Sequence, residues 1–343
     1  MRRVFHADYV GDLGSMDYER ATLAAAGAEL AVARCATAEE LIAKAAGAQV
    51  VWLEWTPHID RAVLAALTEC ELVMRWGVGY DQIDVAAATE LGVAVANAPS
   101  YGTENVAEHT MALLLALARG VVADDRAMRA GLWREPPIAH QRLSGQTLGI
   151  LGLGRIGRRV AELGVAFGCR VIGHDVREDI VVPDGVERAS AAEVVAAADY
   201  LTVHTPLGEQ TRHLVNGDLL ARARPGLLLV NTSRGPIVDT DALLAAIDAG
   251  IVAWAALDVF ETEPLPADSP LRSRPEIVLT PHEASSSAEA EDDLRAEMCQ
   301  ATIQWFTEGW ADSVVNPQVR TRLRRGSAGS GGDDPPEPPR GRQ

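Results

Sequence analysis

Short apolar runs of strand length recur along the first third of the chain, with helical patterns between them. The runs lie at residues 4–5, 30–33, 50–53, 72–74 and 93–95. Segments with apolar positions at helical spacing lie at 16–26, 38–46 and 61–67. The second of these helices has Thr37 as its expected N-cap and Glu40 at the capping-box offset. This alternation predicts a parallel sheet covered by helices.

The same alternation resumes after residue 146 and predicts a second sheet. Strands are expected at 148–151, 171–172, 201–204, 227–230, 253–257 and 277–279. Helices are expected at 191–197, 241–249 and 289–306. These strands suffice for a doubly wound sheet.

Three further stretches connect or extend the two sheets. Residues 104–119 form a strongly helical pattern that Thr103 can cap, and the helix is expected to cross between domains. Residues 120–142 show no clear period and are interpreted as an arm or an interface loop. The last helix is expected to return the chain to the first domain. The composition then becomes rich in Gly, Pro, Ser and charge, which predicts disorder.

The predicted fold class is therefore α/β, with a Rossmann cofactor domain and a flavodoxin-like α/β substrate domain. The expected boundaries are 1–100 with 284–317 for the substrate domain, 101–283 for the Rossmann domain and 318–343 for a disordered tail.

Glycines punctuate the start of the second sheet in the pattern G-x-G-x-x-G. Gly152 lets a tight turn close, Gly154 lets the backbone approach a pyrophosphate, and Gly157 lets the following helix lie close to the strand. Free N–H groups at the helix start then bind the phosphate. On the helix itself, one apolar face is expected to be buried, comprising Ile156, Val160, Leu163 and Phe167.

An acid ends the second strand of this unit. Asp175 can accept a hydrogen bond from a ribose 2′-hydroxyl and would repel a 2′-phosphate. The strand, turn, helix, strand and acid together predict a dinucleotide site and favour NAD over NADP. Arg177 nearby keeps NADP open as the alternative.

Composition and charge exclude several function classes. The net charge is −17 and no basic stripe offsets it, which argues against nucleic-acid binding. No apolar run approaches membrane-spanning length, and the N-terminus does not resemble a signal peptide, so we expect a cytoplasmic protein. The four cysteines are scattered without zinc spacing, which predicts buried thiols and no metal site.

Three polar side chains follow later strands of the second sheet. Arg234, Glu263 and His282 each lie where a predicted strand has just ended, and ligands bind at that edge of such sheets. Arginine grips a carboxylate, histidine transfers a proton near neutral pH, and a carboxylate orients the histidine. Taken singly, each has an ordinary structural interpretation as a loop cap, a structural histidine or a solvated acid. Behind a dinucleotide site, the set favours catalysis.

These motifs resemble the D-2-hydroxyacid dehydrogenase family over about residues 50–317. The similar segments are RWGVGYDQIDV (75–85), GVAVANAP (92–99), ENVAEHTMALLLALAR (104–119), GLGRIG (152–157), NTSRGPIVD (231–239), ALDVFETEP (256–264) and TPH (280–282). Within the family, the C-terminal-binding-protein-like and phosphoglycerate-dehydrogenase-like branches look most similar.

The resemblance implies a role for each matched residue. Arg234 would bind the substrate carboxylate and polarise the keto oxygen, His282 would be the acid/base, and Glu263 would pair with it. Gly77 and Val78 would offer backbone N–H groups to the carboxylate. Further cofactor contacts are implied for Arg155 and Ile156 at the pyrophosphate, Asp175 at the ribose, and Thr110, Thr205, Thr232 and Asp258 elsewhere. The family resemblance also implies a homodimer with the crossing helix and arm at its interface.

Two positions predict the character of the substrate pocket. Ser285 stands where relatives often carry an aromatic residue, and Arg75 stands just before the Gly77-Val78 turn that is expected to hold the carboxylate. We expect a small substrate with a polar or anionic far end. Arg75 has an alternative role as the partner of a nearby acid.

Three functions are consistent with these residues. The first is NAD-dependent interconversion of a small 2-keto acid and its D-2-hydroxy acid. The second is an NAD-sensing dimer that recruits partners, as in corepressor-like relatives. The third keeps the fold but acts on formate or phosphite. The intact Arg234, Glu263 and His282 favour the first.

Overall fold

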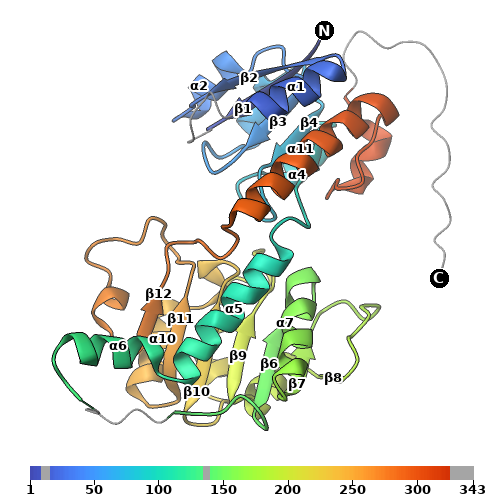
Figure 1. Cartoon of the computed structure of the whole chain (residues 1–343). Helices are drawn as coiled ribbons and strands as arrows, with labels where there is room; N and C mark the ends of the chain where they lie inside the picture. Colours follow the sequence, from blue (N-terminus) through green and yellow to red (C-terminus); the bar gives the residue numbers. More distant parts are fainter. Residues whose placement is uncertain (9–15, 134–139, 325–343) are drawn as a thin grey trace. The chain divides into compact units, whose positions relative to one another are not determined.

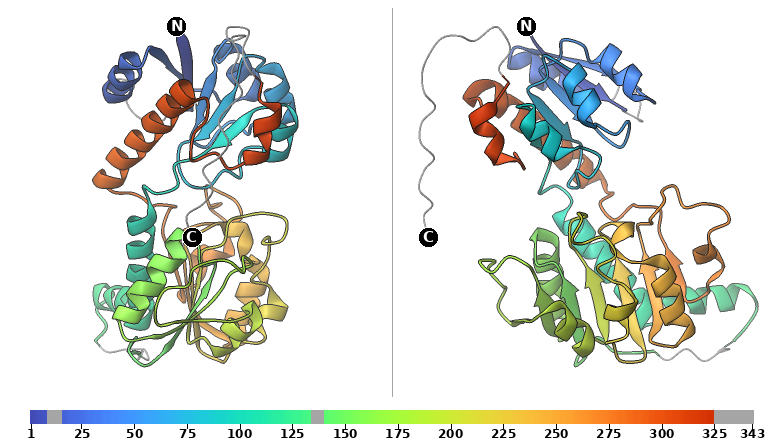
Figure 2. Two further views of the ribbon diagram at one scale, coloured as in Figure 1. Left: turned by 90° about the vertical axis from the view of Figure 1, so that its right-hand side faces the viewer. Right: turned by 180° about the vertical axis from the view of Figure 1, so that it is seen from behind.

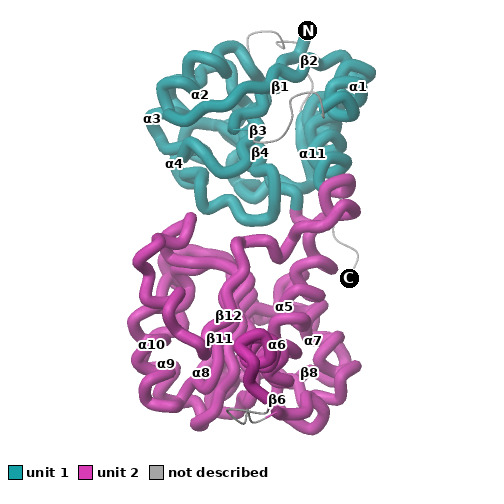
Figure 3. Tube along the Cα trace, turned by 60° about the vertical axis from the view of Figure 1, so that its left-hand side comes forward, with its two compact units in different colours: residues 1–98, 294–343 teal, residues 99–293 magenta. Residues whose placement is uncertain are grey.

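A computed structural model describes residues 1–8, 16–133 and 140–324 of the chain. It divides into two compact units, shown in Figure 3. Unit 1 comprises residues 1–98 and 294–343, and unit 2 comprises residues 99–293. The chain passes from unit 2 back into unit 1 within one long helix, α11 (Ala288–Glu308).

Unit 1 is built on a five-stranded sheet in the order β2-β1-β3-β4-β5. All four strand pairs are parallel, as the alternation of strands and helices predicted. The strands are β1 (Arg2–Ala7), β2 (Ala28–Ala33), β3 (Val50–Leu53), β4 (Leu72–Arg75) and β5 (Ala94–Ala96). The three strands β3, β4 and β5 are buried at every position, as expected for a sheet covered on both faces.

Helices cover both faces of this sheet (Figure 1). On one face lie α2 (Ala38–Lys44), α3 (Arg61–Ala66) and α4 (Val85–Glu90), which share an apolar core with the strands. On the other face α11 contacts the sheet, where Trp52 Nε1 donates to Thr302 Oγ1 at 3.0 Å. Figure 2 shows α11 lying along this side of unit 1, together with α1 (Asp17–Ala25). The predicted cap of α2 is confirmed, because the Thr37 side chain accepts from the Glu40 N–H.

The C-terminal segment stays ordered further than its composition predicts. Residues Pro317–Arg322 form a 3₁₀-helix, η4, in which Val319 is fully buried. The Arg324 N–H donates to Gly92 O at 2.7 Å, which ties the segment to unit 1. The expectation that disorder begins at residue 318 is therefore wrong for this stretch, because one apolar side chain and backbone bonds hold it. The rest of the predicted tail, 325–343, lies outside the described residues.

Unit 2 is built on a seven-stranded sheet in the order β12-β11-β10-β9-β6-β7-β8. Every neighbouring pair is parallel. The strands are β6 (Thr147–Leu151), β7 (Arg170–His174), β8 (Val186–Arg188), β9 (Tyr200–Val203), β10 (Leu227–Asn231), β11 (Val252–Leu257) and β12 (Ile277–Leu279). The strand order reverses between β6 and β9, and ligands of such sheets bind outside the carboxyl ends of the strands at this point.

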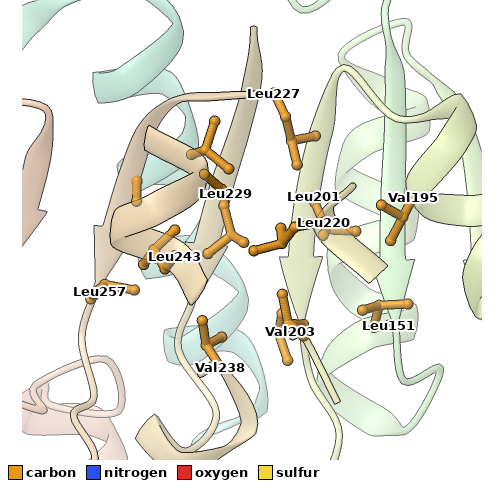
Figure 4. Close-up of a cluster of buried hydrophobic side chains, with 14 of the residues drawn as sticks. Leu151, Val195, Leu201, Val203, Leu220, Leu227, Leu229, Val238, Leu243 and Leu257 are labelled. Carbon is orange, nitrogen blue, oxygen red and sulfur yellow. The ribbon is translucent and has the colours of Figure 1, made fainter. Parts of the chain in front are cut away.

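Two layers of helices enclose the unit 2 sheet. On one face lie α5 (Thr103–Ala118) and α7 (Arg155–Ala166), and on the other lie α8 (Ala191–Ala197), α9 (Gly217–Leu220) and α10 (Thr240–Asp248). Figure 4 shows the apolar cluster under the second layer, in which Leu201, Val203 and Leu229 of the strands meet Leu220 and Leu243 of the helices. A second apolar cluster packs α5 and α7 against the opposite face of the sheet.

The buried face of α7 agrees with the predicted one except at Phe167, and it also contains small residues that the apolar pattern did not mark. The buried positions are Gly157, Val160, Ala161 and Gly164, whereas Phe167 is 44% exposed. A Cβ on Gly164 would lie 2.5 Å from Leu148 Cδ2. The helix therefore approaches β6 so closely that small residues form the contact. Of the predicted face, Val160 is buried and Ile156 and Leu163 pack against the same core, so the prediction fails only at Phe167.

Two predictions about the connecting stretches also need correction. Thr103 is the first residue of α5 and Gly102 occupies the N-cap position, without a side-chain cap. Residues Val121–Arg129 form a helix, α6, within the stretch that showed no clear period. None of its residues is buried, so no apolar stripe marks it in the sequence. The short 3₁₀-helices η2 (Gly235–Ile237) and η3 (Pro270–Ser273) complete the described elements.

Among the described residues, no single helix is long and apolar enough to cross a membrane. The pair α5 and α6 reaches the required length and composition only together, across a bend of 59°.

Candidate active site

The glycine turn between β6 and α7 is closed by backbone contacts that leave no room for side chains. Gly152 has φ of 96°, which favours glycine, and its N–H donates to His174 O at 2.8 Å. A Cβ on Gly157 would lie 1.9 Å from Gly152 O. By contrast, a Cβ on Gly154 would meet nothing within 4 Å, so this glycine faces open space. The turn therefore presents bare backbone at the start of α7.

The N-terminus of α7 opens onto a basic cavity. Arg155 and Ile156 are the first two residues of the helix, whose unpaired N–H groups favour an anion. A cavity of about 360 Å³ lies beside them, and its lining carries three arginines and one carboxylate: Thr103, Arg155, Arg158, Arg159, Glu162, Val181 and Pro183. Such a site suits a pyrophosphate.

Asp175 follows β7 directly and is held by its neighbours. Its carboxylate accepts from the Leu153 N–H at 2.9 Å and from the Arg177 N–H at 3.0 Å. Arg177 also pairs with it through Nε at 3.1 Å. Burial raises the pKa of Asp175, but the bonds from Arg177 and Leu153 outweigh it, so this pKa lies below its ordinary value. The side chain is therefore an anion at neutral pH, oriented by the glycine turn.

A second arginine braces the loop that carries Asp175. Arg188, at the end of β8, donates to Asp175 O at 3.2 Å, Arg177 O at 2.5 Å and Glu178 O at 2.8 Å. Sequence reasoning missed this residue, because nothing in the sequence indicates that β8 runs beside the loop.

Polar atoms without protein partners lie at the end of β9, next to the glycine turn. His204 Nε2 and Thr205 Oγ1 are buried and have no hydrogen-bond partner among the described residues. Burial lowers the pKa of His204 to about 3, so the ring is neutral. Buried polar groups normally have partners, so these orphans fit a site completed by a bound group. The bare glycine turn, the basic helix end and the orphaned atoms together fit NAD.

The remaining predicted cofactor residues lie at the same edge of the sheet. Thr110 on α5 and Thr232 after β10 share a hydrogen bond of 2.8 Å between their hydroxyls, and both are buried. Asp258, after β11, is fully buried. Its carboxylate accepts from Thr280 Oγ1 at 2.5 Å and from the N–H of Ala284 at 3.0 Å.

Asp258 thus braces the segment that carries His282. It also accepts from the Glu283 N–H at 3.0 Å, and its backbone carbonyl accepts from the His282 N–H at 2.8 Å. His109 Nε2 on α5 lies 3.6 Å from the same carboxylate. Sequence reasoning missed this bracing role, although both partners lie in quoted motifs, His109 in ENVAEHT and Thr280 in TPH.

Two of the three predicted catalytic residues are in direct contact. His282 Nδ1 lies 2.7 Å from Glu263 Oε2, and His282 has φ of 58°, an uncommon conformation for a non-glycine residue. Burial raises the pKa of Glu263, but the bond from His282 and the charge of Arg234 outweigh it, so this pKa lies below its ordinary value. With Glu263 ionised, the Nδ1–H of His282 is the donor in this bond.

Arg234 lies in the turn after β10. Asn231 shapes this turn, since its Nδ2 donates to Arg234 O at 2.9 Å and its Oδ1 accepts from the Ser233 N–H at 3.0 Å. Arg234 is close enough to Glu263 for its charge to act on that carboxylate. The structure therefore brings Arg234, Glu263 and His282 to one edge of the unit 2 sheet, from three consecutive strand ends.

The other predicted substrate residues belong to unit 1. The Arg75 guanidinium lies over the Trp55 ring at 4.8 Å, donates to Gln82 Oε1 at 3.4 Å and also bonds Trp76 O. The Gly77 N–H donates to Arg75 O at 2.9 Å, so this donor already has a partner. The Val78 carbonyl accepts from Asn97 Nδ2 at 2.7 Å.

A doubly wound sheet with this glycine turn and with an Arg, Glu and His set at its carboxyl edge defines a dinucleotide-dependent oxidoreductase. Comparisons with known proteins narrow this class. The family model "D-isomer specific 2-hydroxyacid dehydrogenase, NAD binding domain" matches residues 111–284. The chain belongs to this family of NAD-dependent enzymes.

Individual relatives agree with this assignment. The chain is 42% identical over 292 residues to a glyoxylate reductase of Aeropyrum pernix, covering 82% of this chain and 87% of the relative. It is 38% identical over 279 residues to a D-3-phosphoglycerate dehydrogenase of Mycobacterium leprae, covering 81% of this chain but 53% of that longer protein.

Solved structures share the fold. A glyoxylate reductase from Paecilomyes thermophila matches with a TM-score of 0.84 at 27% identity, covering 92% of this chain and 99% of that one. An acyclic imino acid reductase in complex with NADPH and D-Arg matches with a TM-score of 0.84 at 26% identity, covering 92% of this chain and 100% of that one.

Proposed function

We propose that the protein uses NADH to reduce a small 2-keto acid to its D-2-hydroxy acid and catalyses the reverse oxidation with NAD. The observation that carries this proposal is the 2.7 Å contact between His282 and Glu263, within reach of the charge of Arg234. An oriented imidazole beside an arginine is the pair of groups that a keto acid needs, one for its carbonyl oxygen and one for its carboxylate.

The residues would divide the chemistry as follows. Arg234 binds the carboxylate and polarises the keto oxygen. His282 would donate the Nε2 proton to that oxygen, and NADH, when bound, would supply the hydride to the carbon. Ionised Glu263 orients the ring through Nδ1 and stabilises the imidazolium before transfer. In unit 1, the Val78 N–H is the backbone donor we assign to the carboxylate, because the Gly77 N–H already bonds Arg75 O.

We propose a small substrate with a polar or anionic far end, for which hydroxypyruvate is a polar example, or with no far end at all, as in glyoxylate. The 42% identity to a glyoxylate reductase supports this class. Ser285 packs closely against Gly102, since a Cβ on that glycine would lie 3.3 Å from Ser285 Cβ. Neither position supplies an aromatic wall for a long apolar chain. Arg75 remains our candidate for contacting the far end.

We propose NADH rather than NADPH as the preferred cofactor. Asp175 is an oriented anion after β7, and it would repel a 2′-phosphate while accepting from ribose hydroxyls. Arg177 is held by that same carboxylate. Asp175 would therefore repel the 2′-phosphate, and it also forms an ion pair with Arg177, the cation that would otherwise bind that phosphate.

We also propose a homodimer formed through α6. The helix buries none of its residues, and apolar side chains on and after it are exposed. These are Val121 at 56%, Met128 at 53%, Leu132 at 44% and Trp133 at 70%. Sedimentation of the wild type and of Trp133→Ser with Met128→Ser tests this, since a monomer in both cases contradicts it.

The direct test of the activity is an NADH oxidation assay with glyoxylate, hydroxypyruvate, pyruvate and 2-ketoisocaproate, repeated with NADPH. We expect turnover of the first two with NADH and weaker turnover of the longest apolar acid. Silence with every keto acid, while NADH still binds, would contradict the enzyme assignment and favour a recruiting function. Turnover of formate or phosphite alone would favour the third function.

A further inference from the structure

A strained histidine lies between the two loops that carry Arg234 and Glu263. His213 has φ of 50°, in the left-handed region that few residues other than glycine adopt, although histidine is found there more often than most. Its N–H donates to Pro236 O at 2.8 Å, two residues after Arg234. Its Nε2 lies 3.0 Å from Glu261 Oε2, two residues before Glu263. One residue thus bonds both loops.

Glu261, which lies in the Glu263 loop, also bonds the segment that follows the Arg234 turn. Its Oε1 accepts from the Thr240 N–H at 3.0 Å, at the start of α10. Burial raises the pKa of Glu261, but the bonds from Thr240 and His213 outweigh it, so this pKa lies below its ordinary value and the group is ionised. His213 Nδ1 also lies 3.8 Å from Asp239 Oδ2, so the ring is flanked by two carboxylates.

The two loops themselves are in close backbone contact. A Cβ on Gly235 would lie 1.9 Å from the carbonyl carbon of Phe260. The Phe260 N–H in turn donates to Glu263 Oε1 at 2.9 Å, the carboxylate that holds His282. A small displacement of the Glu261 segment would therefore move Glu263 against Arg234.

We propose that His213 and Glu261 are positioning residues that keep the Arg234 turn and the Glu263 loop in register. They touch neither the reacting atoms nor the cofactor in this scheme and act through Pro236, Phe260 and Thr240. Strain that persists at a residue with this many bonds is consistent with a functional constraint. The inference rests on the proposed keto-acid reduction, since the position of one loop relative to the other affects turnover only if Arg234 and His282 act on one substrate.

The test is a double-mutant cycle on the full-length enzyme with glyoxylate and NADH. His213→Asn tolerates the left-handed backbone and removes the ring, and Glu261→Ala removes the carboxylate. Each should lower kcat/KM about 10-fold or more, because small misplacements of catalytic groups have effects of this order. The double variant should be no worse than Glu261→Ala alone, since both changes break the bond between His213 and Glu261 and only Glu261→Ala also removes the acceptor of the Thr240 N–H. Glu261→Gln keeps an acceptor for Thr240 and should fall between wild type and Glu261→Ala.

Two further measurements separate positioning from stability. NADH binding, followed by protein fluorescence, and the melting temperature should stay near wild type in both single variants. The matched control is Asp248→Ala, which breaks the 2.6 Å ion pair to Arg274 at the other end of α10. It should leave kcat/KM unchanged.

The outcomes are distinct. The positioning role is overturned if wild type turns over glyoxylate and the variants have the same kcat/KM. It is also overturned if the losses of kcat/KM in the two single variants add in the double variant. If the variants lose NADH binding or melt far below wild type with kcat/KM lost in proportion, the residues are structural and the proposal is again overturned. If wild type itself reduces no keto acid, the proposed function fails first.

Discussion

At the scale of single residues, the proton chemistry rests on His282 and Glu263. We expect His282→Ala to lower kcat for the best keto acid about 10²- to 10⁴-fold, the usual contribution of a general acid. Glu263→Gln should lower kcat less, because the amide keeps a bond to Nδ1 but loses the charge that stabilises the imidazolium. Steady-state kinetics and NADH binding measure this. A His282→Ala enzyme with nearly full turnover would remove the residue from the mechanism.

A second prediction at this scale concerns cofactor choice. We expect Asp175→Ala to narrow the preference for NADH over NADPH, since the change removes the repulsion and releases the Arg177 guanidinium that the carboxylate holds at 3.1 Å. The double variant with Arg177→Ala should lose the NADPH gained by the single change. The measurement is kcat/KM for both cofactors. A wild type that already prefers NADPH would show the assignment of Asp175 to be wrong.

At the scale of elements, two glycines of the β6–α7 turn should differ in what they contribute, one to the stability of the fold and the other to NADH binding. Gly157→Ala would place a Cβ 1.9 Å from Gly152 O, so the backbone must shift, and we expect a cost of about 1–3 kcal/mol in the free energy of unfolding. Gly154→Ala meets nothing within 4 Å and should melt near wild type, yet bind NADH more weakly because its methyl faces the phosphate position. Melting curves and fluorescence titrations test the pair. Equal stability of both variants would contradict the close contact.

At the scale of the whole molecule, the four cysteines should be unreactive in the folded protein. Cys35, Cys70, Cys169 and Cys299 are all buried. Burial raises the pKa of Cys70 and of Cys299 to about 12 and that of Cys169 to about 11, so few thiolates exist at neutral pH. We expect a disulfide reagent to label none at pH 7.5 and all four in denaturant. Rapid labelling of the native protein would point to opening of one core.

The carboxylates of the site predict how stability changes with pH. The pKa values of Asp175, Glu261 and Glu263 are lowered by folding. A group whose pKa falls on folding contributes stability that is fully present above its unfolded pKa and is lost as pH falls through the folded value. We therefore expect the melting temperature to drop between pH 6 and pH 3. A melting temperature that rises on acidification over that window would show that repulsion within a chain of net charge −17 dominates instead.

Local patterns carry much of this fold. The Thr37 cap, the glycine spacing and the apolar runs depend on short-range geometry, so most long helices and every strand except β8 could be predicted. The same patterns wrongly placed Phe167 on the buried face of α7. They also missed α6, because a helix that buries nothing has no apolar stripe.

For the candidate site, the residue types and their places after strands are properties of the sequence. Arg234, Glu263 and His282 could be predicted because parallel strands end at one edge. The positions of these three side chains relative to one another could not be predicted. The hydrogen bonds to Asp258 and the contact of His213 with Glu261 join residues that are remote in the sequence. The bond from the Gly77 N–H to Arg75 O depends on the angles of one turn. Chemistry at strand ends follows from local sequence, whereas the partners that orient it depend on packing between segments, which only the tertiary structure decides.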